Sequence, residues 1–151
     1  MKLAELPGIA GIKEASGNVP QIMEIIRNKP KNFFVLSGDD SITLPLMSVG
    51  CDGVISVVAN EVPSAFSQMV NAALQENFIE ARAIHNELLN LMNINFIESN
   101  PIPVKSALAM MGIIHEVYRL PLTQMSAEHR FALRRVLEEL QLIPNGVSAA
   151  L

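Results

Sequence analysis

The sequence has little cysteine and little charge, and each shortage excludes a class of protein. Its 151 residues contain one cysteine, Cys51, so no intramolecular disulfide framework can form and a reducing compartment is indicated. We expect Cys51 to be a small packed residue, not a catalytic thiol. The net charge is −4 and basic residues do not cluster, so the electrostatic signature of a nucleic-acid-binding protein is absent and no nucleic-acid partner is expected.

Long apolar runs are also absent, although 50% of the residues are hydrophobic. No run approaches the roughly 18 residues that a membrane span requires. Glu5 and Pro7 interrupt the first residues, which lack the apolar core of a signal peptide. We therefore expect a soluble, cytoplasmic protein with no membrane partner. The mean hydropathy of +0.31 suits a chain that buries much of itself or has lost a partner surface.

The first half of the chain repeats one unit three times: an apolar strand, a polar turn and a helix. The expected strands are 9–13, 33–36 and 54–58, and the helices are 20–27, a short one through 44–47, and 63–76. Strands that alternate with helices pair in parallel, because only a crossover connects parallel neighbours. Asp39 or Asp40 is expected to cap the short second helix by accepting its free backbone N–H groups.

The second half is expected to be helical throughout. Apolar periodicity predicts one helix after Asn77, a second opened by Pro101-Ile102-Pro103, and a third capped by Ser126. The domain prediction is therefore βα units over 1–76, a helical region over 77–144 and a tail over 145–151. Three βα units leave a parallel sheet covered on one face only and open at both edges. The chain thus looks like part of a larger α/β fold, and we expect dimers or larger assemblies.

Lys13 is the residue with the most distinctive placement. Strand alternation puts it on one face with Gly11 and Ala15, near the end of an apolar strand. Apolar surroundings favour the neutral amine of a lysine, which is the nucleophile that forms Schiff bases with carbonyl compounds. On spacing alone, the alternative is a lysine that merely extends past the strand end into solvent.

No metal site or cofactor is expected. His85, His115 and His129 are expected on different helices, with no histidine at i+4 and no cysteine nearby. The glycines stand singly at strand ends and do not form a phosphate-binding loop.

Four segments, in order along the chain, resemble the dihydrodipicolinate synthase (4-hydroxy-tetrahydrodipicolinate synthase) family. They are GIKEASGN at 11–18, LSGDD at 36–40, GVISV at 53–57 and SNPIPVK at 99–105. That family belongs to the class I Schiff-base aldolases, which are carbon–carbon lyases and include N-acetylneuraminate lyase. The resemblance runs from about Leu3 to Ile143 and implies the last three βα units of a (β/α)8 TIM barrel, followed by three C-terminal helices.

The resemblance also implies a reaction and its site. The family condenses pyruvate with L-aspartate-4-semialdehyde in the diaminopimelate route to lysine, usually as a homotetramer. Lys13 matches the lysine that forms the Schiff base with pyruvate, and Ile55 matches the residue whose backbone carbonyl contacts it. Gly38 lies in the turn that lines the same pocket. All three are expected at the C-terminal ends of parallel strands, where barrel active sites are built.

The departures from the family limit this implication. The resemblance begins at the sixth barrel strand, and the first five carry the pyruvate-binding threonines, the proton-relay tyrosines and an arginine for the second substrate. Tyr118, the only tyrosine, lies too far along the chain to replace the relay. Because losing proton-transfer groups costs about 10²–10⁴-fold in rate, we expect the chain alone to be inactive, with another copy or an N-terminal half as partner. A fragment of a sister pyruvate-dependent aldolase (N-acetylneuraminate lyase-like) and a non-catalytic, oligomerising remnant are the alternatives.

Overall fold

A computed structural model describes residues 2–144, and the chain divides into two compact units, Met1–Leu88 and Leu89–Leu151. The first unit holds the sheet and its helices, and the long helix α4 (Phe78–Ile94) continues from it into the second. The tail expected at 145–151 lies outside the described residues.

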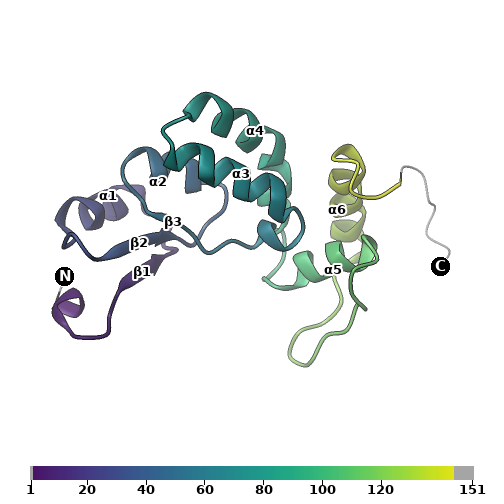
Figure 1. The fold of residues 1–151 in the computed structure, drawn as a ribbon. Helices are drawn as coiled ribbons and strands as arrows, with labels where there is room; N and C mark the ends of the chain where they lie inside the picture. Colours follow the sequence, from purple (N-terminus) through teal and green to yellow (C-terminus); the bar gives the residue numbers. More distant parts are fainter. Residues whose placement is uncertain (1, 145–151) are drawn as a thin grey trace. The chain divides into compact units, whose positions relative to one another are not determined.

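Three short parallel strands form the sheet of the first unit (Figure 1). They are β1 (Gly11–Glu14), β2 (Phe34–Ser37) and β3 (Gly53–Val54), in the spatial order β1-β2-β3. Lys13 lies beside Leu36, which in turn lies beside Gly53. The expected parallel pairing is therefore confirmed.

Helices cover one face of this sheet (Figure 1). A short 3-10 helix, η1 (Lys2–Glu5), precedes β1, and the covering helices are α1 (Val19–Asn28), α2 (Thr43–Ser48) and α3 (Pro63–Leu74). Beneath them, Val35 and Ser37 of β2 are completely buried. Phe34, which alternation places on the opposite face, is 55% exposed. The expectation of a sheet with one covered face holds within this unit.

Two local predictions were wrong, and one carboxylate explains both. The third strand ends at Val54 instead of residue 58, and a 3-10 helix, η2 (Val58–Asn60), follows. Asp40, expected to cap α2, instead accepts the backbone N–H groups of Val57 and Val58, which removes those groups from any strand ladder. The N-cap residue of α2 is Ile42, which makes no side-chain cap. Asp39 caps only the local turn, accepting from the backbone N–H of Ser41 at 3.1 Å.

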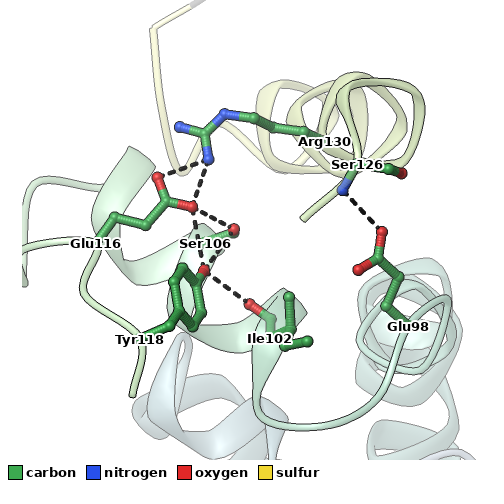
Figure 2. Close-up of polar contacts among 7 residues, drawn as sticks. All are labelled: Glu98, Ile102, Ser106, Glu116, Tyr118, Ser126 and Arg130. Carbon is green, nitrogen blue, oxygen red and sulfur yellow. Dashed lines mark hydrogen bonds and ion pairs between the residues drawn. The ribbon is translucent and has the colours of Figure 1, made fainter. Parts of the chain in front are cut away.

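The second unit is built from the end of α4 together with α5 (Ile102–Met110) and α6 (Ala127–Glu139). Ser126 caps α6 as expected, since its side chain accepts from the backbone N–H of His129. Glu98 accepts the N–H of Ser126 itself at 2.9 Å (Figure 2). These bonds fix where α6 begins.

A partly buried carboxylate joins α5, α6 and the segment between them (Figure 2). Both oxygens of Glu116 lie 2.6 Å from Nη1 of Arg130 on α6. Ser106 of α5 donates to Glu116 at 2.7 Å, and the hydroxyl of Tyr118 donates to it at 3.1 Å. Burial acts to raise the pKa of Glu116, but Arg130 and Ser106 outweigh it and hold the pKa below its ordinary value. The hydroxyl of Tyr118 therefore bonds to side chains of this same unit, Ser106 and Glu116, and has a structural role there.

Candidate active site

Lys13, Gly38 and Ile55 meet at the C-terminal edge of the parallel sheet. Lys13 is the third residue of β1, while Gly38 and Ile55 directly follow β2 and β3. The N–H of Gly38 donates to the carbonyl of Glu14 at 2.7 Å, and the N–H of Ile55 donates to the carbonyl of Ser37 at 2.9 Å. Parallel pairing thus continues one residue past β2 and β3 and places the three predicted residues side by side across neighbouring strands.

Gly38 lies directly against the side chain of Lys13. A Cβ atom added to Gly38 would lie 2.8 Å from Cε of Lys13 and 2.6 Å from Cβ of Ala15. Lys13 could bend away, but Cβ of Ala15 is attached to the backbone and cannot. Any residue larger than glycine at position 38 would therefore collide with Ala15 and with the side chain of Lys13 where it passes the turn.

The face around Lys13 is open. Gly11 and Ala15, its neighbours on the same face, contribute almost no side chain, as the alternation predicted. Lys13 itself is exposed, and Ile55 is 48% exposed. A small carbonyl compound can therefore reach the lysine amine, while the apolar enclosure expected around it is not formed by this unit.

Glu14, next to the lysine, anchors the turn that follows it. Its side chain points to the covered face and is only 8% exposed. It accepts hydrogen bonds from the N–H and hydroxyl of Ser16, at 3.2 and 3.0 Å, and from the side chain of Gln21 at 3.4 Å. Sequence reasoning missed this role, although a glutamate on the inner face of a strand, followed by Ser-Gly-Asn, was the available signal.

Hydroxyl groups hold the turn that carries Gly38. Ser37 and Thr43 are both completely buried, and each donates to the backbone carbonyl of Asp39, at 2.9 and 2.8 Å. The N–H of Asp39 donates back to the hydroxyl of Ser37 at 3.2 Å. The turn against which Lys13 lies is therefore internally bonded, and its position does not depend on solvent.

The other candidate groups have structural surroundings. Cys51 is 4% exposed, its Sγ lies 3.0 Å from the carbonyl of Val35, and burial raises the pKa of its thiol, which confirms a packed residue. Among residues 2–144, no cluster of three or more His, Cys, Asp or Glu side chains is placed to hold a metal ion. No helix in the same range has the length and apolar character needed to cross a membrane.

Parallel βα units with a lysine at their carboxyl edge define the chain as an α/β protein, the class that includes the (β/α) barrels. More particularly, residues 1–140 match the model of the dihydrodipicolinate synthetase family, and the chain belongs to that family.

Relatives of known name support this assignment. The 4-hydroxy-tetrahydrodipicolinate synthase of Koribacter versatilis is 49% identical over 149 residues, which are 99% of this chain and 50% of that protein. The Prosthecochloris aestuarii enzyme of the same name is 49% identical over 140 residues, 93% of this chain and 47% of that protein. The chain therefore spans about half the length of the curated relatives it matches.

Solved structures agree with the sequence matches. The crystal structure of dihydrodipicolinate synthase from Aquifex aeolicus has a TM-score of 0.90 and 44% identity, covering 95% of this chain and 49% of that one. The chloride-inhibited Acinetobacter baumannii enzyme, complexed with pyruvate, also has a TM-score of 0.90 and 44% identity, covering 94% and 49%. The expected fold, the last βα units of a barrel with C-terminal helices, is thus supported by structure as well as by sequence.

Proposed function

We propose that this chain carries the Schiff-base lysine of a 4-hydroxy-tetrahydrodipicolinate synthase, with pyruvate and L-aspartate-4-semialdehyde as substrates in diaminopimelate and lysine biosynthesis. The observation that supports it most directly is the contact between Lys13 and Gly38 at the carboxyl edge of the sheet. The names of the relatives described above favour this synthase over an N-acetylneuraminate lyase-like aldolase. A relative solved with pyruvate supports that compound as the carbonyl substrate.

The proposed chemistry begins with addition of the neutral Lys13 amine to the C2 carbonyl carbon of pyruvate. Loss of water then gives an imine, which accepts electrons when a methyl proton is removed. The resulting enamine carbon forms the new bond to the aldehyde, and hydrolysis of the imine returns the lysine. Gly38 leaves room beside Cε of Lys13, and the backbone of Ile55 is proposed to contact the bound pyruvate.

A partner is part of this proposal, because the face around Lys13 is open. Phe34 and Ile55 expose large apolar side chains there, and both faces of parallel sheets are normally covered. We propose that an N-terminal half or further copies of the chain cover this face and supply the proton-transfer groups. The chain alone is then inactive as a synthase. A cytoplasmic location accords with the single, buried thiol of Cys51.

The direct test is trapping of the imine. The purified chain is incubated with pyruvate and borohydride, which reduces the imine to a stable secondary amine, and the product is examined by intact mass and peptide mapping. One adduct on Lys13 is expected, absent from Lys13→Ala and retained in Lys31→Ala, since Lys31 is an exposed lysine away from the strand edge. Equal labelling of Lys31, or no adduct even with the N-terminal half of a relative added, contradicts the proposal.

The exposure of Lys13 favours one second candidate, a non-catalytic protein that associates through its open sheet. This candidate predicts oligomers in light scattering and no pyruvate adduct. The trapping experiment, run beside light scattering on the same sample, separates the two functions.

A further inference from the structure

We propose that Asp40 is a positioning residue for the Lys13 site, holding the backbone of Ile55 against the turn that carries Gly38. The inference rests on the proposed function of Lys13, because it assigns Asp40 a role in placing the groups around the pyruvate imine. The carboxylate of Asp40 bonds to the backbone N–H groups of Val57 and Val58 and not to Lys13, so it acts through the backbone.

The carboxylate of Asp40 joins two loops that are far apart in sequence. Its Oδ2 atom accepts the backbone N–H groups of Val57 and Val58 at 2.9 and 2.8 Å. Asp40 follows β2, whereas Val57 and Val58 follow β3, 17 and 18 residues later. Hydrogen bonds to an ionised acceptor are roughly twice as strong as neutral ones. Asp40 therefore fastens the loop after β3 to the turn after β2.

Ile55 is held from both sides by that one turn. Its own N–H donates to the carbonyl of Ser37 at 2.9 Å, and two residues later the chain is held by Asp40. Gly38 stands between Ser37 and Asp40 and touches the side chain of Lys13. The turn thus couples the positions of Lys13, Gly38 and Ile55, and Asp40 supplies its link to the loop beyond Ile55.

The burial of Asp40 is costly for a residue that serves packing alone. The side chain is 1% exposed, and its second oxygen, Oδ1, is buried without a hydrogen-bond partner. Buried carboxylates usually satisfy both oxygens, and an unsatisfied one lowers stability. Retaining a charged group at this position is consistent with the need to hold two adjacent N–H groups at once.

Asp52 offers a matched control at the other end of the sheet. Its Oδ2 atom accepts the backbone N–H of Val35 at 2.8 Å and pairs with Lys29. It too is a carboxylate that joins β2 to the chain around β3, but it precedes β3 and lies away from the carboxyl edge. Replacing Asp52 therefore removes a comparable bond without disturbing the turn beside Lys13.

The experiment compares Asp40→Ala, Asp40→Asn and Asp52→Ala in the full chain labelled with ¹⁵N and ¹³C. Asp40→Ala is expected to speed amide exchange at Val57 and Val58 at least tenfold and to shift the Ile55 carbonyl resonance. Asp52→Ala should instead speed amide exchange at Val35, whose N–H donates to Asp52. Pyruvate trapping at Lys13 should fall roughly 10- to 100-fold in Asp40→Ala relative to Asp52→Ala, as expected for a misplaced reacting group. Asp40→Asn, which keeps one acceptor oxygen but no charge, should fall between wild type and alanine in both exchange and trapping.

Two results overturn the inference: unchanged exchange at Val57 and Val58, or equal loss of trapping in the Asp40 and Asp52 variants. If Asp40→Ala does not fold, Asp40→Asn decides, and wild-type exchange in that variant contradicts the role of the carboxylate. If the wild-type chain forms no adduct, the proposed function of Lys13 in the isolated chain fails. The exchange rates and the Ile55 resonance then still decide whether Asp40 positions the loop.

Discussion

Lys13 and Gly38 are in such close contact that no side chain fits between them. A Cβ atom on Gly38 would lie 2.8 Å from Cε of Lys13 and 2.6 Å from Cβ of Ala15. The absence of a side chain at Gly38, directly after β2, therefore determines where the side chain of Lys13 on β1 can lie. This relationship can be tested without a full synthase.

Replacing Gly38 by alanine should displace Lys13. Overpacking of this kind typically costs about 1–3 kcal/mol of stability, and the yield of borohydride-trapped pyruvate should fall beyond what the stability loss explains. Gly17→Ala is the control, since a Cβ there meets nothing within 4 Å, although its φ of +69° makes the substitution costly. Denaturant unfolding measures the stability of each variant, and peptide mass mapping measures the yield of trapped adduct. Equal trapping in the two variants contradicts steric control by Gly38.

The ion pair of Asp52 should make stability depend on acid pH. Burial acts to raise the pKa of Asp52, but its bonds with Lys29 and the N–H of Val35 outweigh burial and lower it. A lowered folded-state pKa stabilises the fold above the unfolded value of about 3.9, and that stability is lost as pH falls through the folded pKa. The unfolding free energy of Asp52→Asn should therefore differ most from wild type near neutral pH.

The expected difference at neutral pH is about 1–3 kcal/mol, and it should shrink below about pH 4. Urea unfolding across pH measures it. Glu24→Gln, which removes an exposed pair with Arg27, is the control and should change stability little at any pH. A constant difference between Asp52→Asn and wild type from pH 7 to pH 3 is incompatible with this linkage.

The Glu116 carboxylate should stabilise the second unit. Glu116→Gln weakens its bonds to Arg130 and Ser106, which are short and partly buried, and should cost about 1–3 kcal/mol. Hydrogen exchange should rise in α5 and α6. Arg135→Ala, which breaks an exposed 3.9 Å pair with Glu139, should cost under about 1 kcal/mol. Similar losses in both variants argue against a special role for Glu116.

The open sheet face should govern association. Phe34, at the start of β2, is 55% exposed on the open face of the sheet, so Phe34→Ser removes apolar surface from that face with little loss of core packing. If further copies of the chain cover this face, light scattering should show more monomer in Phe34→Ser than in the wild-type chain. Leu74→Ser on α3, which is 56% exposed on a helix, is the matched control. An unchanged assembly in Phe34→Ser places the contact elsewhere.

Local patterns were enough to predict most of the elements. Alternation assigned Lys13 and Glu14 to opposite faces, and helical periodicity together with the Ser126 cap located α6. These features depend on residues within one or two turns of each other. The third strand was overextended because 54–58 is apolar except for Ser56, and nothing nearby signals that the amides of Val57 and Val58 bond elsewhere.

The sequence by itself determined the order of strands and helices, the family, and the lysine that marks the candidate site. Only the tertiary structure decided that Gly38 touches Lys13 and that Asp40 binds the amides of Val57 and Val58 instead of capping α2. Both contacts join residues of different strand ends, brought together by parallel pairing across a helix. A side chain with several possible donors bonds to those that folding places nearest, and this choice is not encoded in local spacing.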